Sequence, residues 1–185
     1  EDIHKRTASE IFGVDINEVD GEMRRRAKTI NFGLLYGMSA FGLSNQLGVS
    51  RPEAEIFLNS YFERYSGVKQ FMHDIVERSK ESKYVETLYG RKIHVPNIVA
   101  SNYMVRQGAE RAAINGPLQG SASDIIKYAM VEIDKWINAN NPEIRMILQV
   151  HDELVFEVPQ SFNESDLSPI LKLMENTTEI EVPLK

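Results

Sequence analysis

The sequence has no cysteine among its 185 residues, which excludes disulfide bonds and metal sites built on thiolates. It also lacks a long apolar run: no stretch approaches the roughly 20 residues that span a bilayer, and the first residues show no signal-peptide pattern. We therefore expect no membrane as a partner, and a reducing cytoplasm fits this composition. The sequence opens on Glu1 instead of Met, and we expect it to be a piece of a longer protein.

An excess of basic charge is missing as well, since the formal net charge is −6 at pH 7. The charges are unevenly distributed: residues 1–131 contain 17 Lys and Arg against 16 Asp and Glu, whereas residues 132–185 contain 4 against 11. A uniformly basic surface, the usual mark of a nucleic-acid-binding protein, is therefore excluded. Any contact with nucleic acid has to come from local clusters of basic side chains.

One such cluster lies on a predicted helix that runs from about Met23 to Tyr36 behind an Asp20 N-cap. Functional side chains recur there at every fourth position, which places them on one helical face: Arg24, Lys28, Phe32 and Tyr36. This face is roughly 18 Å long, with cations in its N-terminal half and aromatic rings in its C-terminal half. It suits a nucleotide, because cations bind a triphosphate while a ring lies against the sugar or base. An ordinary amphipathic helix with a basic solvent side is the alternative.

A second candidate site lies in the acidic C-terminal part, where two short apolar runs flank a polar break, His151-Asp152-Glu153. We predict a β-hairpin over residues 146–158 with acidic side chains at its tip. A carboxylate fixed at a strand turn can bind Mg²⁺, which takes oxygen ligands in tight octahedral geometry. A plain solvent-exposed acidic turn gives the same pattern, so the motif alone does not decide between them.

The rest of the sequence predicts a mostly helical α+β fold. Ser50 and Glu53 form a capping box that starts a helix through Tyr65; after a break at residues 66–67, an amphipathic stretch reaches about residue 82. A small hairpin is expected at residues 84–88 and 92–95. Residues 103–115 again predict a helix, which Pro117 should end or kink. An apolar stripe at 125–137 predicts a helix that ends near 140–142, and a short helix follows at 167–174.

These motifs, taken together and in order, resemble the family A DNA polymerases, the bacterial DNA polymerase I group. The similarity covers the whole chain and includes further segments at 1–4, 36–43, 61–65, 84–88, 110–120 and 174–176. It implies a fingers subdomain at residues 1–100 and part of the palm at 101–185. The implied activity is DNA-templated addition of deoxynucleotides to a primer 3′ end with two Mg²⁺ ions. Primer-template DNA and deoxynucleoside triphosphates are the implied partners, and the implied location is the bacterial cytoplasm, in association with the nucleoid.

For the incoming nucleotide the resemblance implies five contacts: His4, Arg24, Lys28, Phe32 and Tyr36. Lys28 would also act in catalysis, since a compact ammonium neutralises charge that shifts on the phosphates during transfer. Arg24 would add a forked donor. Phe32 would pack on the sugar, and Tyr36 would close the floor of the base-pair pocket. A capping or surface role for His4 and a buried core position for Tyr36 are the alternatives.

For the primer-template the resemblance implies contacts from one helix and from the acidic hairpin: Arg106, Arg111, Asn115, Gln119, Gln149 and His151. The spacing places Arg111 and Asn115 on one helical face, with Gln119 just past the expected helix break. Hydrogen-bonding side chains of this kind test base pairing through minor-groove acceptors. Arg106 is expected on a phosphate. Without the resemblance, these helix residues would be ordinary surface polar groups.

Asp152 is the expected metal ligand, with Glu153 in support; a solvated turn is the alternative for Glu153. The family has a second catalytic aspartate in an earlier palm motif, and this sequence begins after it. It also stops before the family's final strand, and no exonuclease domain is visible. We therefore expect the isolated chain to be a catalytically inactive fragment that binds nucleotide or DNA. A metal hydrolase built on His151 and Asp152 lacks further His or Cys at ligand spacing.

Overall fold

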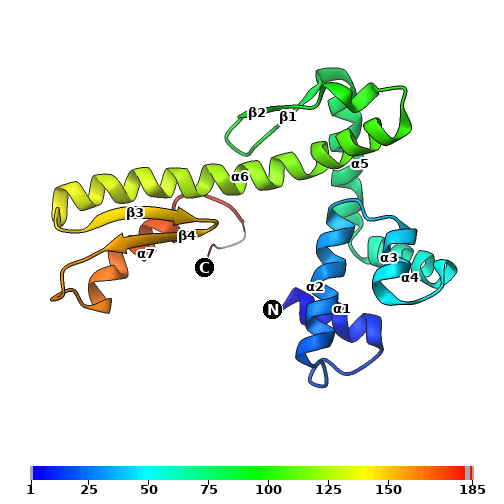
Figure 1. Cartoon of the computed structure of the whole chain (residues 1–185), viewed down its shortest axis with the longest axis horizontal. Coiled ribbons are helices and arrows are strands. Elements are labelled where there is room, and N and C mark those ends of the chain that lie inside the picture. The colour runs from blue at the N-terminus through cyan, green and yellow to red at the C-terminus, as the bar shows by residue number, and fades with distance from the viewer. Residues whose placement is uncertain (1, 182–183, 185) are drawn as a thin grey trace. The chain divides into compact units, whose positions relative to one another are not determined.

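The computed structural model describes residues 2–181 and residue 184, and it consists mostly of helices with two small antiparallel hairpins (Figure 1). This confirms the α+β, mostly helical fold predicted from the sequence. The chain divides into two compact units, of which the first comprises Glu1–Glu86 and Lys92–Pro117 and the second comprises Thr87–Arg91 and Leu118–Lys185. Within the described ranges, no helix is long and apolar enough to cross a lipid bilayer.

The first unit begins with helices α1 to α5. Their bounds are Ile3–Phe12 for α1, Gly21–Leu35 for α2, Ala40–Leu47 for α3, Arg51–Arg64 for α4 and Ser66–Ser82 for α5. The three predicted helices, α2, α4 and α5, are present, and the predicted capping box of Ser50 and Glu53 starts α4. Helices α1 and α3 were not predicted. Each is capped by a side-chain oxygen, from Asp2 and Ser39 respectively, and each is followed by a glycine with positive φ.

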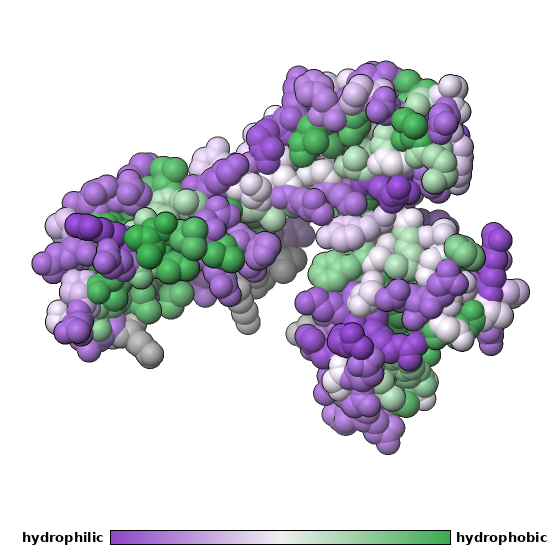
Figure 2. Space-filling view, viewed as in Figure 1, coloured by the Kyte–Doolittle hydropathy of each residue, from purple (hydrophilic) through white to green (hydrophobic). Residues whose placement is uncertain are grey.

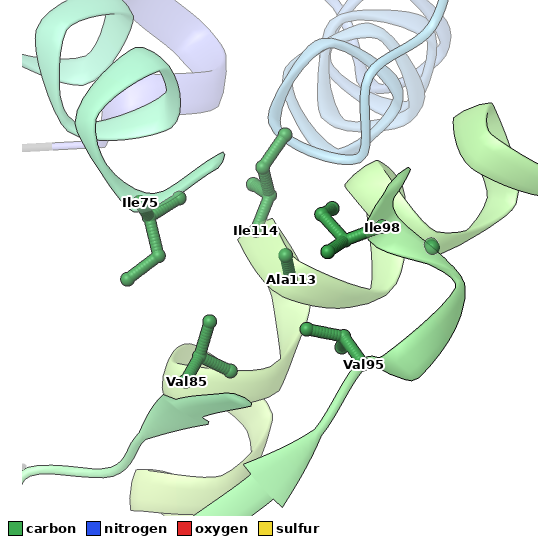
Figure 3. Close-up of a cluster of buried hydrophobic side chains, with 7 residues drawn as sticks. Ile75, Val85, Val95, Ile98, Ala113 and Ile114 are labelled. Carbon is green, nitrogen blue, oxygen red and sulfur yellow. The ribbon is translucent and has the colours of Figure 1, made fainter. Parts of the chain in front are cut away.

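Two clusters of buried apolar side chains stabilise the first unit. One joins α2, α3 and α4 through Ile30, Leu34, Leu43, Ala54 and Tyr61. The other, shown in Figure 3, joins α5, the hairpin of β1 (Tyr84–Glu86) and β2 (Lys92–His94), a 3-10 turn (Pro96–Val99) and the N-terminal part of α6. In the predicted hairpin, Val85 pairs with Ile93 in antiparallel register.

The second unit is built on the hairpin of β3 (Arg145–Val150) and β4 (Glu153–Glu157), followed by a 3-10 turn (Glu164–Leu167) and helix α7 (Ser168–Glu175). Its core joins these elements to the C-terminal part of α6 through Ala129, Ile133, Ile137, Ile144 and Ile170. The hairpin and the short last helix were both predicted. Figure 2 shows an apolar patch over α6 and β3, where Val131, Ile147 and Leu148 are exposed.

Helix α6 spans Tyr103–Asn140 and contains Pro117 in its interior. Of the two predicted outcomes, an end or a kink at Pro117, the helix end does not occur. Proline removes one backbone N–H and crowds the carbonyl four residues earlier, at a cost of roughly 3 kcal/mol. The helix is anchored on both sides of this position, by Ala113 and Ile114 in one core and by residues from Ala129 onward in another. Packing of an apolar helix face supplies more stability than local propensity and outweighs the proline.

Candidate functional site

Helix α2 has a buried face and an exposed face, and the exposed face carries the predicted site residues. Asp20 caps its N-terminus and Glu22 lies in its first turn, as predicted. Ala27, Ile30, Asn31 and Leu34 are buried. The side chains spaced by four are on the opposite side and remain accessible; Phe32 is 40% and Tyr36 is 37% exposed. This exposure excludes the alternative of a buried core tyrosine at position 36.

Aromatic rings and a cation form a continuous row along this exposed face. The ring centroids of His4 and Phe32 are 5.7 Å apart, and those of Phe32 and Tyr36 are 6.0 Å apart. Nζ of Lys28 lies 5.7 Å from the centroid of the Phe32 ring, within the range of a cation–π contact. The structure therefore brings together four of the five residues predicted at the nucleotide, with the ammonium directly beside the rings.

Arg24, the fifth residue, is held by the start of α1. Its Nε donates to Oδ2 of Asp2 over 2.7 Å, while Oδ1 of Asp2 accepts from the backbone N–H groups of His4 and Lys5. The hydrogen bond from Arg24, followed by that from the Lys5 backbone, lowers the pKa of Asp2 below its usual value. A guanidinium has five N–H donors, so Arg24 retains further donors for a second acceptor.

His4 reaches this face from α1 and is held from behind by α2. Its Nδ1 lies 3.0 Å from Nδ2 of Asn31, a buried residue. Burial, followed by the charge of Arg24, lowers the pKa of His4; Asp2 opposes this shift, and Lys28 adds a smaller lowering effect. The half-buried environment of His4 therefore favours the neutral imidazole, and Asp2, not His4, is the capping residue of α1.

A hollow of about 370 Å³ opens beside the C-terminal end of α2. Tyr36 lines it together with polar side chains of α6, Gln107 and Arg111. Gly37 has φ +77°, and a Cβ there would lie 3.3 Å from Cγ of Arg111, so a glycine lets the chain turn closely over this side chain. Arg111 is thereby brought next to Tyr36 within the first unit.

The polar side chains of α6 differ in how available they are. Arg106 already donates to the carbonyl of Ala100 over 2.9 Å and stacks on the Tyr103 ring. Asn115 is half-buried, and its Oδ1 is buried without a hydrogen-bond partner among the described residues. Arg111 and Gln119 are exposed. Gln119 follows Pro117 without a helix break and lies in the second unit.

The acidic tip of the β3–β4 hairpin is a two-residue loop. Val150 pairs with Glu153, and His151 between them adopts the left-handed region with φ +55°. Its carbonyl accepts a hydrogen bond of 2.9 Å from Nε2 of Gln149. Asp152 and Glu153 are exposed. Among the residues that the structure describes, no group of three or more His, Asp or Glu side chains is placed to hold a metal ion.

The sequence profile of the DNA polymerase family A matches residues 1–185. This chain belongs to the family A DNA polymerases. It is 48% identical over 183 residues to DNA polymerase I of Pseudomonas aeruginosa, with 99% of this chain and 20% of that protein aligned. It is 45% identical over 184 residues to DNA polymerase I of Bacillus caldotenax, covering 100% of this chain and 21% of that protein.

A solved structure shares the fold of this family A chain: the POL domain of Pol1 from M. smegmatis in complex with DNA primer-template and dNTP. The TM-score is 0.93 with 43% sequence identity, and the match covers 100% of this chain and 33% of that one. The chain spans about one fifth of the length of the curated relatives it matches. It therefore corresponds to a segment of the family's polymerase region.

Sequence reasoning missed two polar clusters of this family A chain. One is the contact of Asn31 with His4. The sequence hints at it only through a polar residue, Asn31, among the buried apolar residues of α2. The other holds the turn between β1 and β2 on α6: Nε of Arg91 donates to Oδ1 of the buried Asp124 over 2.8 Å, and Nη2 donates to the Gly120 carbonyl over 3.0 Å. The Thr87 hydroxyl, followed by Arg91, lowers the pKa of Asp124.

Proposed function

We propose that this chain forms the nucleotide-binding part and a portion of the metal site of a DNA-templated DNA polymerase. The observation that carries the proposal is the exposed face of α2, where Lys28, Phe32 and Tyr36 form one row with His4 of α1. Arg24 lies one turn before Lys28 on the same helix and is bound to Asp2. Family membership supports the proposal. So does the related M. smegmatis domain, whose structure is described as a complex with DNA primer-template and dNTP.

On this face, the cations would bind the triphosphate of a deoxynucleoside triphosphate, and the aromatic rings would contact its sugar and base. The Lys28 ammonium and the remaining Arg24 donors bind phosphate oxygens through charge-assisted hydrogen bonds. The Phe32 ring packs against the sugar, and Tyr36 lies under the base. Lys28 also stabilises charge that develops on the phosphates as the 3′-hydroxyl attacks, so the protein contributes through positioning and electrostatics.

The hairpin tip contributes oxygen ligands for Mg²⁺. Carboxylates suit this hard cation, and Asp152, supported by Glu153, would hold it. When bound, a pair of such ions activates the attacking hydroxyl and stabilises the leaving pyrophosphate. Two divalent cations at close distance need several carboxylate oxygens to offset their repulsion, and the tip offers two acids. We therefore propose that the 185-residue chain by itself binds nucleotide or DNA without extending a primer.

The primer-template would contact the exposed polar groups of α6 and of the hairpin. Arg111 lies beside the hollow that Tyr36 lines, which supports a role next to the new base pair. We further propose minor-groove contacts for Asn115 and Gln119, a phosphate contact for Arg106, and contacts at the primer end for Gln149 and His151. Assignment of residues 1–100 to fingers and 101–185 to palm, and a cytoplasmic, nucleoid-associated location, belong to the same proposal.

A binding titration on the 185-residue chain tests the α2 face. A fluorescent deoxynucleoside triphosphate is titrated with Mg²⁺ into the unaltered chain, Lys28→Ala and Lys69→Ala, which removes an exposed lysine of α5. Loss of a hydrogen bond to a charged group costs roughly 1.5–3 kcal/mol, so Lys28→Ala should weaken binding at least about tenfold. Lys69→Ala should leave affinity unchanged. Equal effects of both changes would reject the α2 face as the binding site.

A further inference from the structure

A buried amide connects the imidazole of His4 to the interior of the first unit. Asn31 is only 4% exposed and reaches from α2 to two side chains of α1. Its Nδ2 lies 3.0 Å from Nδ1 of His4 and 3.1 Å from Oγ1 of Thr7. The Thr7 hydroxyl, itself buried, lies 2.9 Å from the carbonyl of Ile3 one turn earlier. These groups form one chain of hydrogen bonds.

The direction of the hydrogen bond to His4 follows from the end of the Asn31 amide that faces it, next to the Thr7 hydroxyl. That hydroxyl lies close to both ends of the Asn31 amide: Oγ1 of Thr7 is 3.2 Å from Oδ1, to which it can donate, and 3.1 Å from Nδ2, from which it can accept. Nδ2 is the end of the amide that faces His4. An amide nitrogen carries two protons and cannot accept, so Nδ2 donates to Nδ1 of His4.

A neutral imidazole has one donor and one acceptor nitrogen. Because Nδ1 accepts from Asn31, the ring proton has to be on Nε2. The doubly protonated, charged ring would place an Nδ1–H against the Asn31 N–H. The same charged form is disfavoured by burial and by Arg24 and Lys28 on α2, with Asp2 at the start of α1 as the opposing group. Within the described part of the chain, Nε2 has no hydrogen-bond partner.

We infer that Asn31 is a positioning residue: it holds His4 as the neutral Nε2–H tautomer, so that His4 offers a donor to a phosphate oxygen of the bound nucleotide. The identity of the acceptor rests on the proposed function, whereas the tautomer does not. A neutral donor complements the face, because it adds a hydrogen bond beside Arg24 and Lys28 without a third positive charge close to them. The other tautomer would present a lone pair and repel the phosphate.

The tautomer is directly measurable in the full 185-residue chain without ligand. Long-range ¹H–¹⁵N correlation of ¹⁵N-labelled protein at neutral pH reports the protonation of both ring nitrogens of every histidine. His4 should show a fully protonated Nε2 and an unprotonated Nδ1. The exposed rings of His73, His94 and His151 serve as references in the same spectrum. A protonated Nδ1 in the unaltered chain, or a tautomer mixture like that of the references, overturns the inference.

Two substitutions separate positioning from mere packing. Thr7→Val removes the hydroxyl that contacts the amide, at nearly constant volume, and the His4 signal should change to a mixture of both tautomers. Asn31→Asp replaces the donor by an acceptor, and Nδ1 should become protonated. Asn45→Asp, an exposed position on α3, adds the same charge and should leave the His4 signals unchanged. Unchanged His4 signals in folded Thr7→Val and Asn31→Asp would also reject the role of Asn31.

Addition of a deoxynucleoside triphosphate then tests the acceptor separately. A donor that is present half of the time lowers affinity twofold, since apparent affinity scales with the competent fraction. Thr7→Val should therefore weaken binding about twofold, and the Nε2–H proton of the unaltered chain should shift on binding. If the tautomer is as inferred but the triphosphate leaves Nε2–H unaffected, the proposed nucleotide contact of His4 fails while the positioning by Asn31 stands.

Discussion

The α2 face and the tip of the β3–β4 hairpin differ in how much of a site each contains. The helix repeats a spacing, so one local segment supplies a row of side chains more than two turns long, and α1 adds His4 to it. The hairpin presents only the residues at its turn, Asp152 and Glu153, and both are exposed. The proposed nucleotide-binding face thus needs only one helix pair, whereas the proposed site for two metal ions would need carboxylates from further segments.

Two aspartates of the second unit, one buried and one exposed, show a similar contrast. Asp124 is 7% exposed and held by Arg91, whereas Asp152 is exposed at the tip. We expect the first to matter for stability and the second for chemistry.

The largest expected effect is complete absence of primer extension by the 185-residue chain. The two acids proposed at the hairpin tip are too few to hold two Mg²⁺ ions, so we expect the 3′-hydroxyl and the α-phosphate not to be held in line. Purified chain is incubated with primer-template, four deoxynucleotides and Mg²⁺, beside a full-length family A DNA polymerase as a positive control. Templated extension by the chain that disappears in Asp152→Ala would show that the acids of this hairpin suffice for catalysis. It would contradict the contrast between the α2 face and the hairpin tip.

Lys28→Ala in the intact polymerase should give the next largest effect. Removal of a donor to developing charge typically reduces a rate constant by roughly 100-fold or more, so single-turnover incorporation should slow by this order. Ground-state affinity for the nucleotide should fall less, because phosphate charge rearranges during transfer. Lys28→Arg retains the charge and should recover part of the rate. An unchanged single-turnover rate in Lys28→Ala would remove Lys28 from the catalytic groups.

Asp124→Asn should lower the stability of the second unit by about 1–3 kcal/mol, because a charge-assisted contact to Arg91 is lost in a buried place. Fluorescence of Trp136, the single tryptophan and a neighbour of that unit's core, reports its unfolding. Asp152→Asn and the exposed Asp134→Asn are matched controls and should change the midpoint little. Equal midpoints for all three variants would contradict the distinction between the two aspartates.

The pH dependence of this effect has a definite sign. The folded chain lowers the pKa of Asp124, through Thr87 first and Arg91 second, so folding favours the ionised carboxylate. The stabilisation is present above the unfolded value of about 3.9 and is lost as pH falls through the folded value. The difference between the unaltered chain and Asp124→Asn should thus be largest near pH 7 and shrink below about pH 4.

Phe32→Tyr in the intact polymerase should have the smallest effect on normal synthesis. Ordinary incorporation should be nearly unchanged, while the added hydroxyl replaces a contact that a missing 3′-hydroxyl otherwise makes. One such hydrogen bond is worth about 1 kcal/mol, so incorporation of a dideoxynucleotide should improve roughly fivefold or more relative to the normal substrate. Competition between the two substrates measures this ratio. Unaltered discrimination would count against a place for Phe32 at the sugar.

Local sequence signals predicted the helices and hairpins that carry both regions. The fourfold spacing of Arg24 to Tyr36 and the apolar runs around His151 are short-range patterns, and the structure has the expected elements there. Helices α1 and α3 have equally local signals, Asp2 and Gly13 for one and Ser39 and Gly48 for the other. These two helices were missed although such capping residues mark the ends of helices.

The other structural features that were not predicted depend on contacts between residues that are far apart in the sequence. Asn31 meets Thr7 and His4 across 24 and 27 residues, and Arg91 meets Asp124 across 33. No spacing rule predicts such pairs. The helix does not end at Pro117 for the same reason, since it is held by two separate cores that a local rule for helix breakers does not consider. Whether the individual site residues act as proposed stays a prediction.

The left-handed backbone at His151 has a consequence for engineering heat resistance. A left-handed φ costs an L-residue roughly 1–2 kcal/mol relative to glycine. Because His151 has φ +55°, this turn is less stable than the same turn with glycine at position 151. His151→Gly should relieve this cost and raise resistance to thermal unfolding, while it deletes the imidazole next to Asp152. The stability of this turn and the proposed contact of His151 at the primer end therefore favour different residues at position 151.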